Sequence, residues 1–99
     1  MGPKQFYVYI MASGKRGTIY VGVTSDLPSR VIQHREHQFP GSFTDRYNVD
    51  QLAWFEVHEG AETAIRREKQ IKEWRRAWKV ELIQKTNPTW RDLFNDFTL

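Results

Sequence analysis

FYVYIMASGKRGTIYVGV, residues 6–23, is the stretch of sequence that decides the fold. Its two ends, 6–11 and 18–23, are rich in β-branched and aromatic residues, which favour strands. The segment SGKRG between them is rich in residues that form turns. We therefore predict a β-hairpin, around which the rest of the chain builds an α+β domain.

The register of this hairpin determines which side chains meet across it. A four-residue loop at Ser13–Arg16 places Tyr9 directly opposite Tyr20, on the face that the aliphatic side chains of both strands do not use. The aliphatic face then goes to the core. The other face presents two adjacent phenols with Gly22 beside them, where a ligand can approach closely. An ordinary aromatic cross-strand pair explains the same pattern.

The remaining elements follow from turn signals, helix caps and hydrophobic periodicity. The sequence predicts a helix that begins at Ser25 or Asp26 and ends near Gln38, a third strand at 51–59, a long helix from after Gly60 to about Lys85, and a short last helix at 89–97 with Thr89 and Asp92 as its capping box. The order is β-β-α-β-α-α. This is an α+β fold with a small three-stranded, mostly antiparallel sheet flanked by helices.

Length and composition restrict the class of protein. At 99 residues we expect one domain over 1–99, because a single core of ordinary size uses that length. The absence of Cys excludes disulfides and thiolate metal sites. The start lacks the apolar run of a signal peptide, and no stretch approaches the ~20 apolar residues of a membrane span. We therefore expect a cytoplasmic protein with no membrane partner.

The positive charge is concentrated in one part of the chain. Residues 61–85 hold eight Lys or Arg against four Glu, a local charge of +4 in a chain whose net charge is +3. A basic helix of this kind can follow a phosphate backbone, because neutralising phosphates releases condensed counterions. A solvent-exposed helix face accounts for the same residues.

One stripe of the first predicted helix combines a guanidinium with imidazoles. Arg30 and His34 are four residues apart and His37 follows three later, so all three lie on one side. A permanent cation beside a titratable ring suits the holding and protonation of a phosphate ester. Two alternatives remain: a solvated helix face, or His34 and His37 as zinc ligands with a carboxylate from elsewhere.

Glu68 falls inside the apolar stripe of the long predicted helix. Residues within roughly 80° of it on a helical projection are Ala61, Ala64, Ile65, Ile71, Trp78 and Leu82. A carboxylate turned toward a core needs a cation or good hydrogen-bond donors. Lys72, one turn on, can supply an ion pair. The alternative is a hard divalent metal held by one carboxylate and waters.

The ordered set of these residues resembles a known family. Tyr7-Val8-Tyr9 and Tyr20-Val21-Gly22 lie in the first two predicted strands, Arg30 follows Tyr20 by ten residues, His34 follows Arg30 by four, and Glu68 and Asn87 come later. In this order and spacing the sequence resembles the GIY-YIG nucleases, named after two tripeptides on the first two strands. The runs YVYIMAS, YVGVTSDLPSR, FTDRY, REKQIKEWRRAWK and NPTWRDL are similar to the family's small stand-alone bacterial branch.

The resemblance implies a role for each member of the set. Tyr20 is the implied general base, Tyr9 its hydrogen-bonding neighbour, Arg30 the clamp on the scissile phosphate, His34 an aid to proton transfer, and Glu68 the ligand of a single Mg²⁺ or Mn²⁺. These roles suit phosphoryl transfer, which depends on positioning and charge neutralisation. The implied activity is metal-dependent hydrolysis of phosphodiester bonds in DNA, in preference to RNA, for repair or processing.

One departure from the family concerns the site's basic residues. Val23 stands where several members carry a basic residue, and the sequence offers as nucleic-acid contacts Lys15, Arg35, Arg46, Arg67 and Lys72. Gly22 is expected to support the site. Asn87 corresponds to a late Asn of the family, although it can equally form the turn before Pro88.

Two other functions stay open. One is a nucleic-acid-binding or partner-binding module of the same fold with little or no turnover, since family nucleases usually gain substrate choice from an appended domain; a protein partner can supply that choice instead. The other is an interaction domain, which requires Trp74 or Trp78 to be exposed in a patch.

Overall fold

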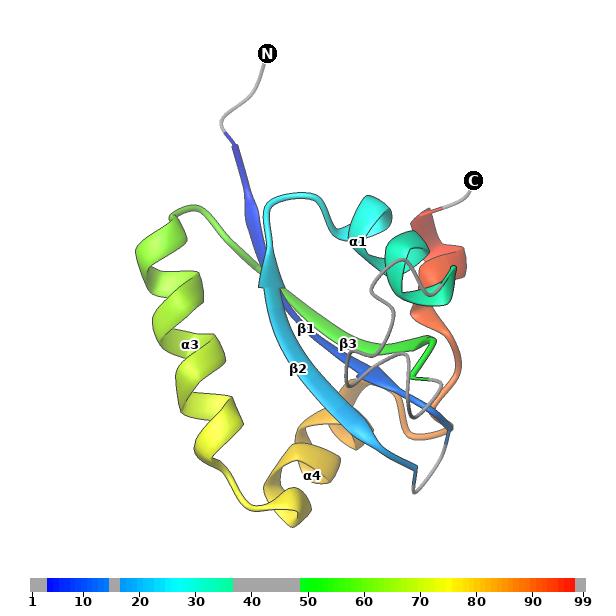
Figure 1. Cartoon of the computed structure of the whole chain (residues 1–99). Coiled ribbons are helices and arrows are strands. Elements are labelled where there is room, and N and C mark those ends of the chain that lie inside the picture. Colours follow the sequence, from blue (N-terminus) through cyan, green and yellow to red (C-terminus); the bar gives the residue numbers. More distant parts are fainter. Residues whose placement is uncertain (1–3, 15–16, 37–48, 98–99) are drawn as a thin grey trace.

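The fold combines a small antiparallel sheet with helices on both of its faces (Figure 1). A computed structural model describes residues 4–14, 17–36 and 49–97. The elements in chain order are β1 (Phe6–Ala12), β2 (Ile19–Thr24), α1 (Leu27–Arg35), β3 (Gln51–His58), α3 (Ala61–Glu73), α4 (Arg76–Thr86) and the 3-10 helix η1 (Leu93–Phe97). The predicted α+β class and the three-stranded antiparallel sheet are confirmed.

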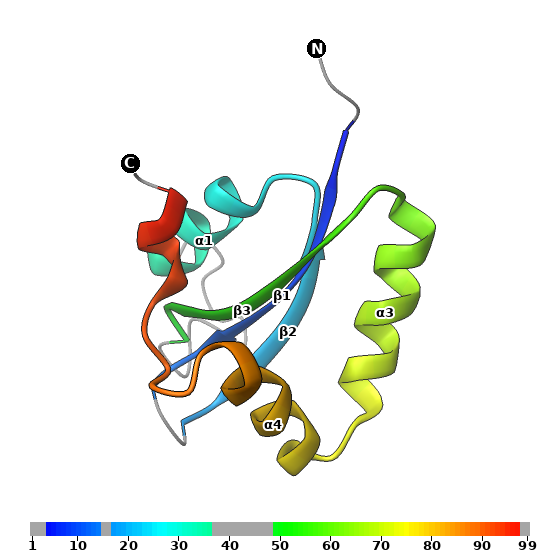
Figure 2. The same ribbon diagram turned by 180° about the vertical axis from the view of Figure 1, so that it is seen from behind.

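Strand β1 is the centre of the sheet, with β2 on one side and β3 on the other. Both pairings are antiparallel. Figure 1 and the opposite view in Figure 2 show α3 on one side of the sheet and α1 on the other. Among the described helices, none is both long and apolar enough to cross a membrane.

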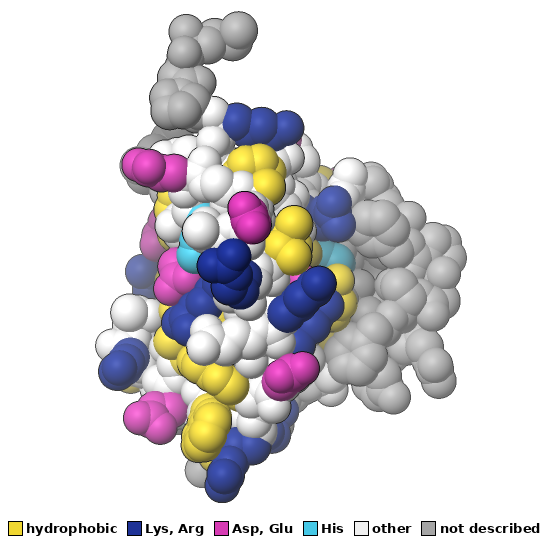
Figure 3. All heavy atoms as spheres, turned by 90° about the vertical axis from the view of Figure 1, so that its left-hand side faces the viewer, with side chains coloured by type: hydrophobic (Ala, Val, Ile, Leu, Met, Phe, Trp, Pro, Cys, Tyr) yellow, Lys and Arg dark blue, Asp and Glu magenta, His cyan; other side chains and the backbone are white. Residues whose placement is uncertain are grey.

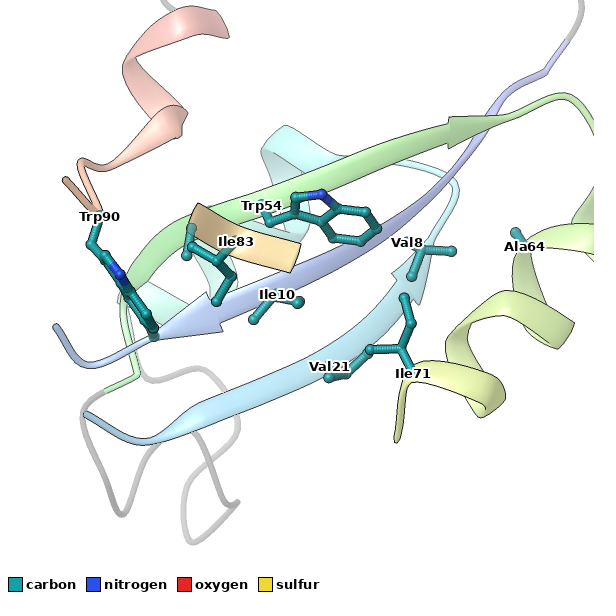
Figure 4. Close-up of a cluster of buried hydrophobic side chains, with 10 residues drawn as sticks. Val8, Ile10, Val21, Trp54, Ala64, Ile71, Ile83 and Trp90 are labelled. Atoms are coloured by element: carbon teal, nitrogen blue, oxygen red, sulfur yellow. The ribbon is translucent and has the colours of Figure 1, made fainter. Parts of the chain in front are cut away.

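The larger hydrophobic core lies between the sheet and the pair α3 and α4 (Figure 4). Its labelled members are Val8, Ile10, Val21, Trp54, Ala64, Ile71, Ile83 and Trp90. A second core lies between the other face and α1 with η1, and includes Tyr9, Met11, Leu27, Val31, Leu52 and Leu93. Alternate residues of β1 thus serve opposite cores, as the pleat of a strand requires.

The hairpin register differs from the predicted one by two residues. Tyr9 pairs with Gly22, and Tyr20 pairs with Met11. The Ser13 N–H donates to the Thr18 carbonyl at 3.0 Å, so the four loop residues are 14–17, one position further along than expected. The shift keeps every side chain on its predicted face, since strand faces repeat every second residue. Tyr9 and Tyr20 become diagonal neighbours.

The single long helix predicted from Gly60 to Lys85 is wrong. Trp74 and Arg75 have extended backbone, with ψ values of 148° and 157°, and divide the segment into α3 and α4. A continuous helix of that length measures about 37 Å, whereas an eight-residue strand offers about 27 Å of sheet. The break turns the chain back, so that Ile83 reaches the core beside β3.

The break also changes which residues of the predicted apolar stripe are buried. Ala64 and Ile71 are fully buried, as expected for α3. Ile65 and Trp78 are 42% and 48% exposed, contrary to expectation. Phase counted from Glu68 therefore holds for Ala64 and Ile71, and it fails at Ile65, at the edge of the predicted stripe on the same helix. It also fails at Trp78, which lies on a different helix.

The first and the last predicted helices also differ from the observed ones at one end each. Asp26 caps α1 by accepting from the Ser29 N–H at 3.3 Å, and the helix ends at Arg35, short of the predicted Gln38, which lies outside the described residues. The last helix is a 3-10 turn that begins after Asp92. Asp92 accepts from the Phe94 N–H at 3.1 Å, and Thr89 does not act as a cap.

Candidate active site

Three rings from separate elements gather on the α1 face of the sheet. Tyr9 comes from β1, Tyr20 from β2 and His34 from α1. The ring centroids are 6.3 Å apart for Tyr9 and Tyr20, 6.0 Å for Tyr9 and His34, and 5.4 Å for Tyr20 and His34. The hairpin register and the cap of α1 together bring these rings into contact distance.

Tyr9 is the buried member of the two phenols. Its side chain has no exposed surface, and its hydroxyl lies 3.1 Å from His34 Nε2. Burial raises the pKa of Tyr9 well above that of a free phenol, and the charges of Tyr20 and Glu68 raise it further, against the opposing effect of Arg30. Tyr9 therefore keeps its proton. Arg30 offers only donors, and the Tyr9 hydroxyl is hydrogen-bonded to His34 Nε2.

His34 is a neutral ring at physiological pH. Burial lowers its pKa from 6.5 to about 4, and the positive charge of Arg30 acts in the same direction. This lowered pKa favours the neutral ring, and the role of His34 as an aid to proton transfer stays a prediction. His34 Nε2 is hydrogen-bonded to the Tyr9 hydroxyl. The zinc alternative requires His37, which lies outside the described residues.

Arg30 lies one turn before His34 on α1 and belongs to the same group of side chains. It forms a side-chain hydrogen bond with Tyr9, and its charge lowers the pKa values of Tyr9 and His34. A half-buried guanidinium among aromatic rings retains strong attraction for an anion, because the surrounding rings exclude water.

Glu68 reaches the site from α3 and is only 7% exposed. Its carboxylate is near enough to raise the Tyr9 pKa. Lys72 Nζ lies 2.8 Å from Glu68 Oε1, forming the ion pair that the spacing allows, yet outside hydrogen-bonding geometry. Within the described residues Oε1 consequently accepts no hydrogen bond. A carboxylate has more lone pairs than one ammonium contacts, and carboxylate oxygens are ligands that a hard cation such as Mg²⁺ prefers.

A metal at this position would have one protein carboxylate, that of Glu68, as its ligand among the described residues. In residues 4–14, 17–36 and 49–97, no three His, Cys, Asp or Glu side chains converge to hold an ion. Mg²⁺ commonly keeps several waters and takes its remaining ligands from substrate phosphates. Glu68 alone is thus compatible with a metal that is bound together with substrate.

Comparison with known proteins assigns this arrangement to a family. Residues 5–81 match the family described as the GIY-YIG catalytic domain. The chain belongs to the GIY-YIG family. Membership implies endonuclease activity in general, and the residues described above lie within the matched segment.

The relatives of this GIY-YIG chain are small bacterial proteins. It is 32% identical over 82 residues to a UPF0213 protein of Syntrophus aciditrophicus, covering 83% of this chain and 92% of the relative. It is 32% identical over 77 residues to a UPF0213 protein of Staphylococcus saprophyticus, covering 78% and 92%. The predicted small bacterial branch is confirmed.

A solved structure supports the same assignment. The solution NMR structure of the UPF0213 protein BH0048 from Bacillus halodurans is similar, with a TM-score of 0.55 and 25% sequence identity. The match covers 89% of this chain and 92% of that one. The GIY-YIG fold expected from the sequence is therefore present across most of the chain.

Two of the residues that the sequence offered as nucleic-acid contacts, Arg35 and Arg67, interact with other residues of the protein. Arg35 pairs with Asp92, donates from Nε to the Asp50 carbonyl at 3.2 Å and lies over the Phe94 ring. It thereby ties α1 to η1 and to the residues before β3. Its guanidinium already has a carboxylate partner, and its role as a phosphate contact stays a prediction.

Arg67 has a similar position between α3 and β3. Its Nε lies 3.3 Å from Glu56 Oε1, its Nη1 donates to Gln70 at 2.9 Å, and its guanidinium lies 5.3 Å from the Trp74 ring centroid. Arg67 therefore also joins two elements of this GIY-YIG domain, and its contact with nucleic acid stays a prediction. Lys15 and Arg46 lie outside the described residues.

Asn87 supports the fold through all of its side-chain groups. Its Nδ2 donates to the Ala53 carbonyl at 3.0 Å and the Arg91 carbonyl at 2.8 Å, and its Oδ1 accepts from the Arg91 N–H at 3.0 Å. Ala53 is the residue that a bulge in β3 leaves without a partner in β1. Asn87 thus provides a hydrogen-bond donor for the Ala53 carbonyl of the irregular strand, and it stabilises the turn before Pro88.

Proposed function

We propose that this GIY-YIG protein is a metal-dependent endonuclease that hydrolyses phosphodiester bonds in DNA, in the cytoplasm. The observation that carries the proposal is the convergence of Tyr9, Tyr20 and His34, with ring centroids no more than 6.3 Å apart, beside Arg30 and the buried Glu68. Two phenols, a guanidinium and a carboxylate from four elements match what a phosphodiesterase needs to position and neutralise a phosphate.

The difference in burial supports different roles for the two phenols. Tyr20 is half-buried and can contact substrate, whereas Tyr9 has no exposed surface. We assign Tyr20 as the general base. Tyr9, held protonated and bonded to His34, is a positioning residue that fixes the wall of the site.

The charged residues act on the phosphate itself. Arg30 can donate two parallel hydrogen bonds to phosphate oxygens, a geometry that a lysine does not reproduce. Glu68 would hold the single Mg²⁺ or Mn²⁺, which supplies charge neutralisation at the phosphate when bound. Glu68 Oε1, buried and without a hydrogen bond among the described residues, is the atom that supports this assignment.

A second candidate function is a nucleic-acid-binding module with little or no turnover. The specific observation in its favour is the Lys72 ammonium, 2.8 Å from Glu68 Oε1. That cation already neutralises the carboxylate and competes with a metal for it. In this case Arg30 and the surrounding surface bind phosphate without cleaving it.

Cleavage assays with variants separate the two functions. Single-stranded, duplex and branched DNA and RNA are incubated with Mg²⁺ or Mn²⁺ and with wild type, Glu68→Ala or Tyr20→Phe. Glu62→Ala is the matched control, because Glu62 lies on the same helix with its side chain 88% exposed. Metal-dependent cleavage lost in the first two variants and retained in the control supports the endonuclease.

The other outcomes are equally specific. Cleavage that persists in both Glu68→Ala and Tyr20→Phe indicates a contaminating nuclease and contradicts the assigned site. Binding without cleavage by the wild-type protein favours the module. Faster cleavage of RNA than of DNA overturns the choice of substrate while leaving the site assignment intact.

A further inference from the structure

The break between α3 and α4 leaves two tryptophans beside a groove on the surface. Trp74 and Trp78 meet edge to face, with ring centroids 6.1 Å apart, and Trp78 is 48% exposed. The groove has a volume of about 230 Å³ and is lined by Trp74, Trp78, Glu81, Leu82 and Lys85. An exposed Trp of this kind is costly in water and typical of binding surfaces.

The cations around this groove are free of carboxylate partners. The residues from 75 to 85 include four cations and one acid: Arg75, Arg76, Lys79, Lys85 and Glu81. In the described part of the chain none of the four forms an ion pair: Arg76 donates to the Gly17 carbonyl at 2.6 Å and Lys79 to the Lys72 carbonyl at 3.3 Å, both neutral acceptors.

Most basic residues of α3 differ in this respect. Three of its four, Arg66, Arg67 and Lys72, each lie within 3.5 Å of a carboxylate. Of the basic residues in the 61–85 segment without an ion pair among the described residues, Lys69 lies on α3, and the other four are Arg75 and the three cations of α4 around Trp78. Charge complementarity there calls for an anionic partner.

We propose that Trp78, Arg75, Lys79 and Lys85, here called the α4 ledge, bind an unpaired nucleic-acid strand next to the phosphodiester held in the active site. A base stacks on Trp78 and the flanking phosphates contact the three cations. The proposal deepens the proposed function and rests on it for the identity of the substrate.

Ring geometry favours an unpaired strand over a duplex. The Arg75 guanidinium lies 4.8 Å from the centroid of the Trp78 ring, so that a base can contact an aromatic ring and a cation together. Stacking on a protein side chain needs a base whose face is open, as in single strands, and duplex bases cover each other. An apolar protein partner would leave four cations without counter-charges.

The α4 ledge is connected to the active site through two lysines. Lys79 Nζ contacts the Lys72 carbonyl, and Lys72 Nζ contacts Glu68 Oε1. Figure 3 shows the face formed by α3, with Lys and Arg side chains along it, Asp and Glu side chains among them, and hydrophobic side chains at both its upper and its lower part. A strand with a phosphate at Arg30 and Glu68 can therefore continue past Lys72 toward Trp78.

Binding measured without metal tests the α4 ledge independently of cleavage. Fluorescently labelled single strands of ~2 to ~16 nucleotides are titrated with wild type, Trp78→Ala, Trp78→Phe and the control Ile65→Ala, an exposed apolar residue of α3. We expect Trp78→Ala to weaken binding of the longer strands about tenfold, the loss of one stacked base. Trp78→Phe and Ile65→Ala retain wild-type affinity, and the shortest strands bind equally to all four proteins.

Salt dependence tests the cations of the α4 ledge. Lys79→Gln and Lys85→Gln each remove one phosphate contact, so the slope of log affinity against log salt falls by about 0.7 per substitution for single strands. An unchanged slope contradicts the proposal. So does unchanged affinity in Trp78→Ala, or a Trp78→Ala effect confined to the oligomeric state in size-exclusion chromatography.

The two proposals fail in distinguishable ways. If wild type cleaves nothing but Trp78→Ala weakens strand binding, the endonuclease proposal fails and the α4 ledge stands. If wild type cleaves and Trp78→Ala binds and cleaves long strands normally, the ledge is overturned and the endonuclease stands.

Discussion

Tyr9 and Gly22 face each other across β1 and β2, and the Tyr9 ring occupies the space that a side chain at position 22 would need. A Cβ at Gly22 would lie 2.5 Å from Tyr9 Cζ and 2.5 Å from Tyr9 Oη. The close approach allowed by Gly22 is thus used by the protein's own phenol, and the space is not open to a ligand.

Gly22→Ala is therefore expected to displace the Tyr9 ring. Overpacking of this kind lowers the free energy of unfolding by about 1–3 kcal/mol, and displacement of Tyr9 breaks its bond to His34. The matched control is Gly60→Ala, where the nearest atom, Thr63 Oγ1, lies 3.8 Å from the added Cβ. Urea unfolding and cleavage assays measure both effects. Equal stability of the two variants contradicts the packing argument.

The hairpin shows how far the sequence could determine the site. Alternation along the strands fixes which face each phenol occupies, and so predicted that Tyr9 and Tyr20 would be neighbours. The loop position sets the register, and SGKRG contains two glycines that permit turns one residue apart. The preference for Tyr9 opposite Gly22 depends on ring packing, which no local pattern encodes.

Asn87→Ala tests the tie between β3 and the C-terminal segment. The change removes three hydrogen bonds and leaves the Ala53 carbonyl and the Arg91 backbone groups without these partners. We expect a loss of about 3 kcal/mol in the free energy of unfolding. Gln84→Ala, an exposed amide on α4, is the control and should change stability by less than about 0.5 kcal/mol. Similar losses in both variants would refute the role of Asn87.

Arg30→Lys tests the phosphate clamp. The charge is kept, but the paired donors of a guanidinium are lost, so cleavage should fall about 10²-fold or more with little change in stability. Arg66→Lys is the matched control, because Arg66 is an exposed residue of α3, 73% accessible, paired only with Glu62. A lysine variant with wild-type activity would show that Arg30 acts only as a charge.

Lys72→Gln tests competition for Glu68. Removal of the ammonium next to Oε1 leaves the carboxylate without its ion pair, so the Mg²⁺ concentration for half-maximal cleavage should fall severalfold. Lys69→Gln, an exposed lysine of the same helix, should leave that concentration unchanged. A higher metal requirement in Lys72→Gln would instead indicate that Lys72 assists the site directly.

The long helix shows where sequence reasoning fails and why. Between Ala61 and Thr86 there is no Gly or Pro, so nothing in the local sequence marks the break at Trp74 and Arg75. The length of the helix is limited by the length of the sheet that it packs against, which is a property of the tertiary structure. The buried positions Ala64, Glu68 and Ile71 of α3 agree with the predicted stripe because they precede the break, although Ile65 at the edge of that stripe is exposed. The sequence did not predict that Trp78 is exposed, because Trp78 follows the break and lies on α4.

The buried His34 predicts how stability depends on pH. Its pKa is lowered from 6.5 to about 4 in the folded protein, so the unfolded chain binds more protons between these values. Stability is then fully present above about pH 6.5 and is lost as the pH falls toward 4, by up to about 3 kcal/mol. His34→Gln keeps an acceptor for Tyr9 but does not titrate, so its unfolding free energy should fall less over the same range. Urea unfolding of both proteins between about pH 7 and pH 4 measures the difference. Parallel curves would show that the ring is hydrated and titrates as it does in the unfolded chain.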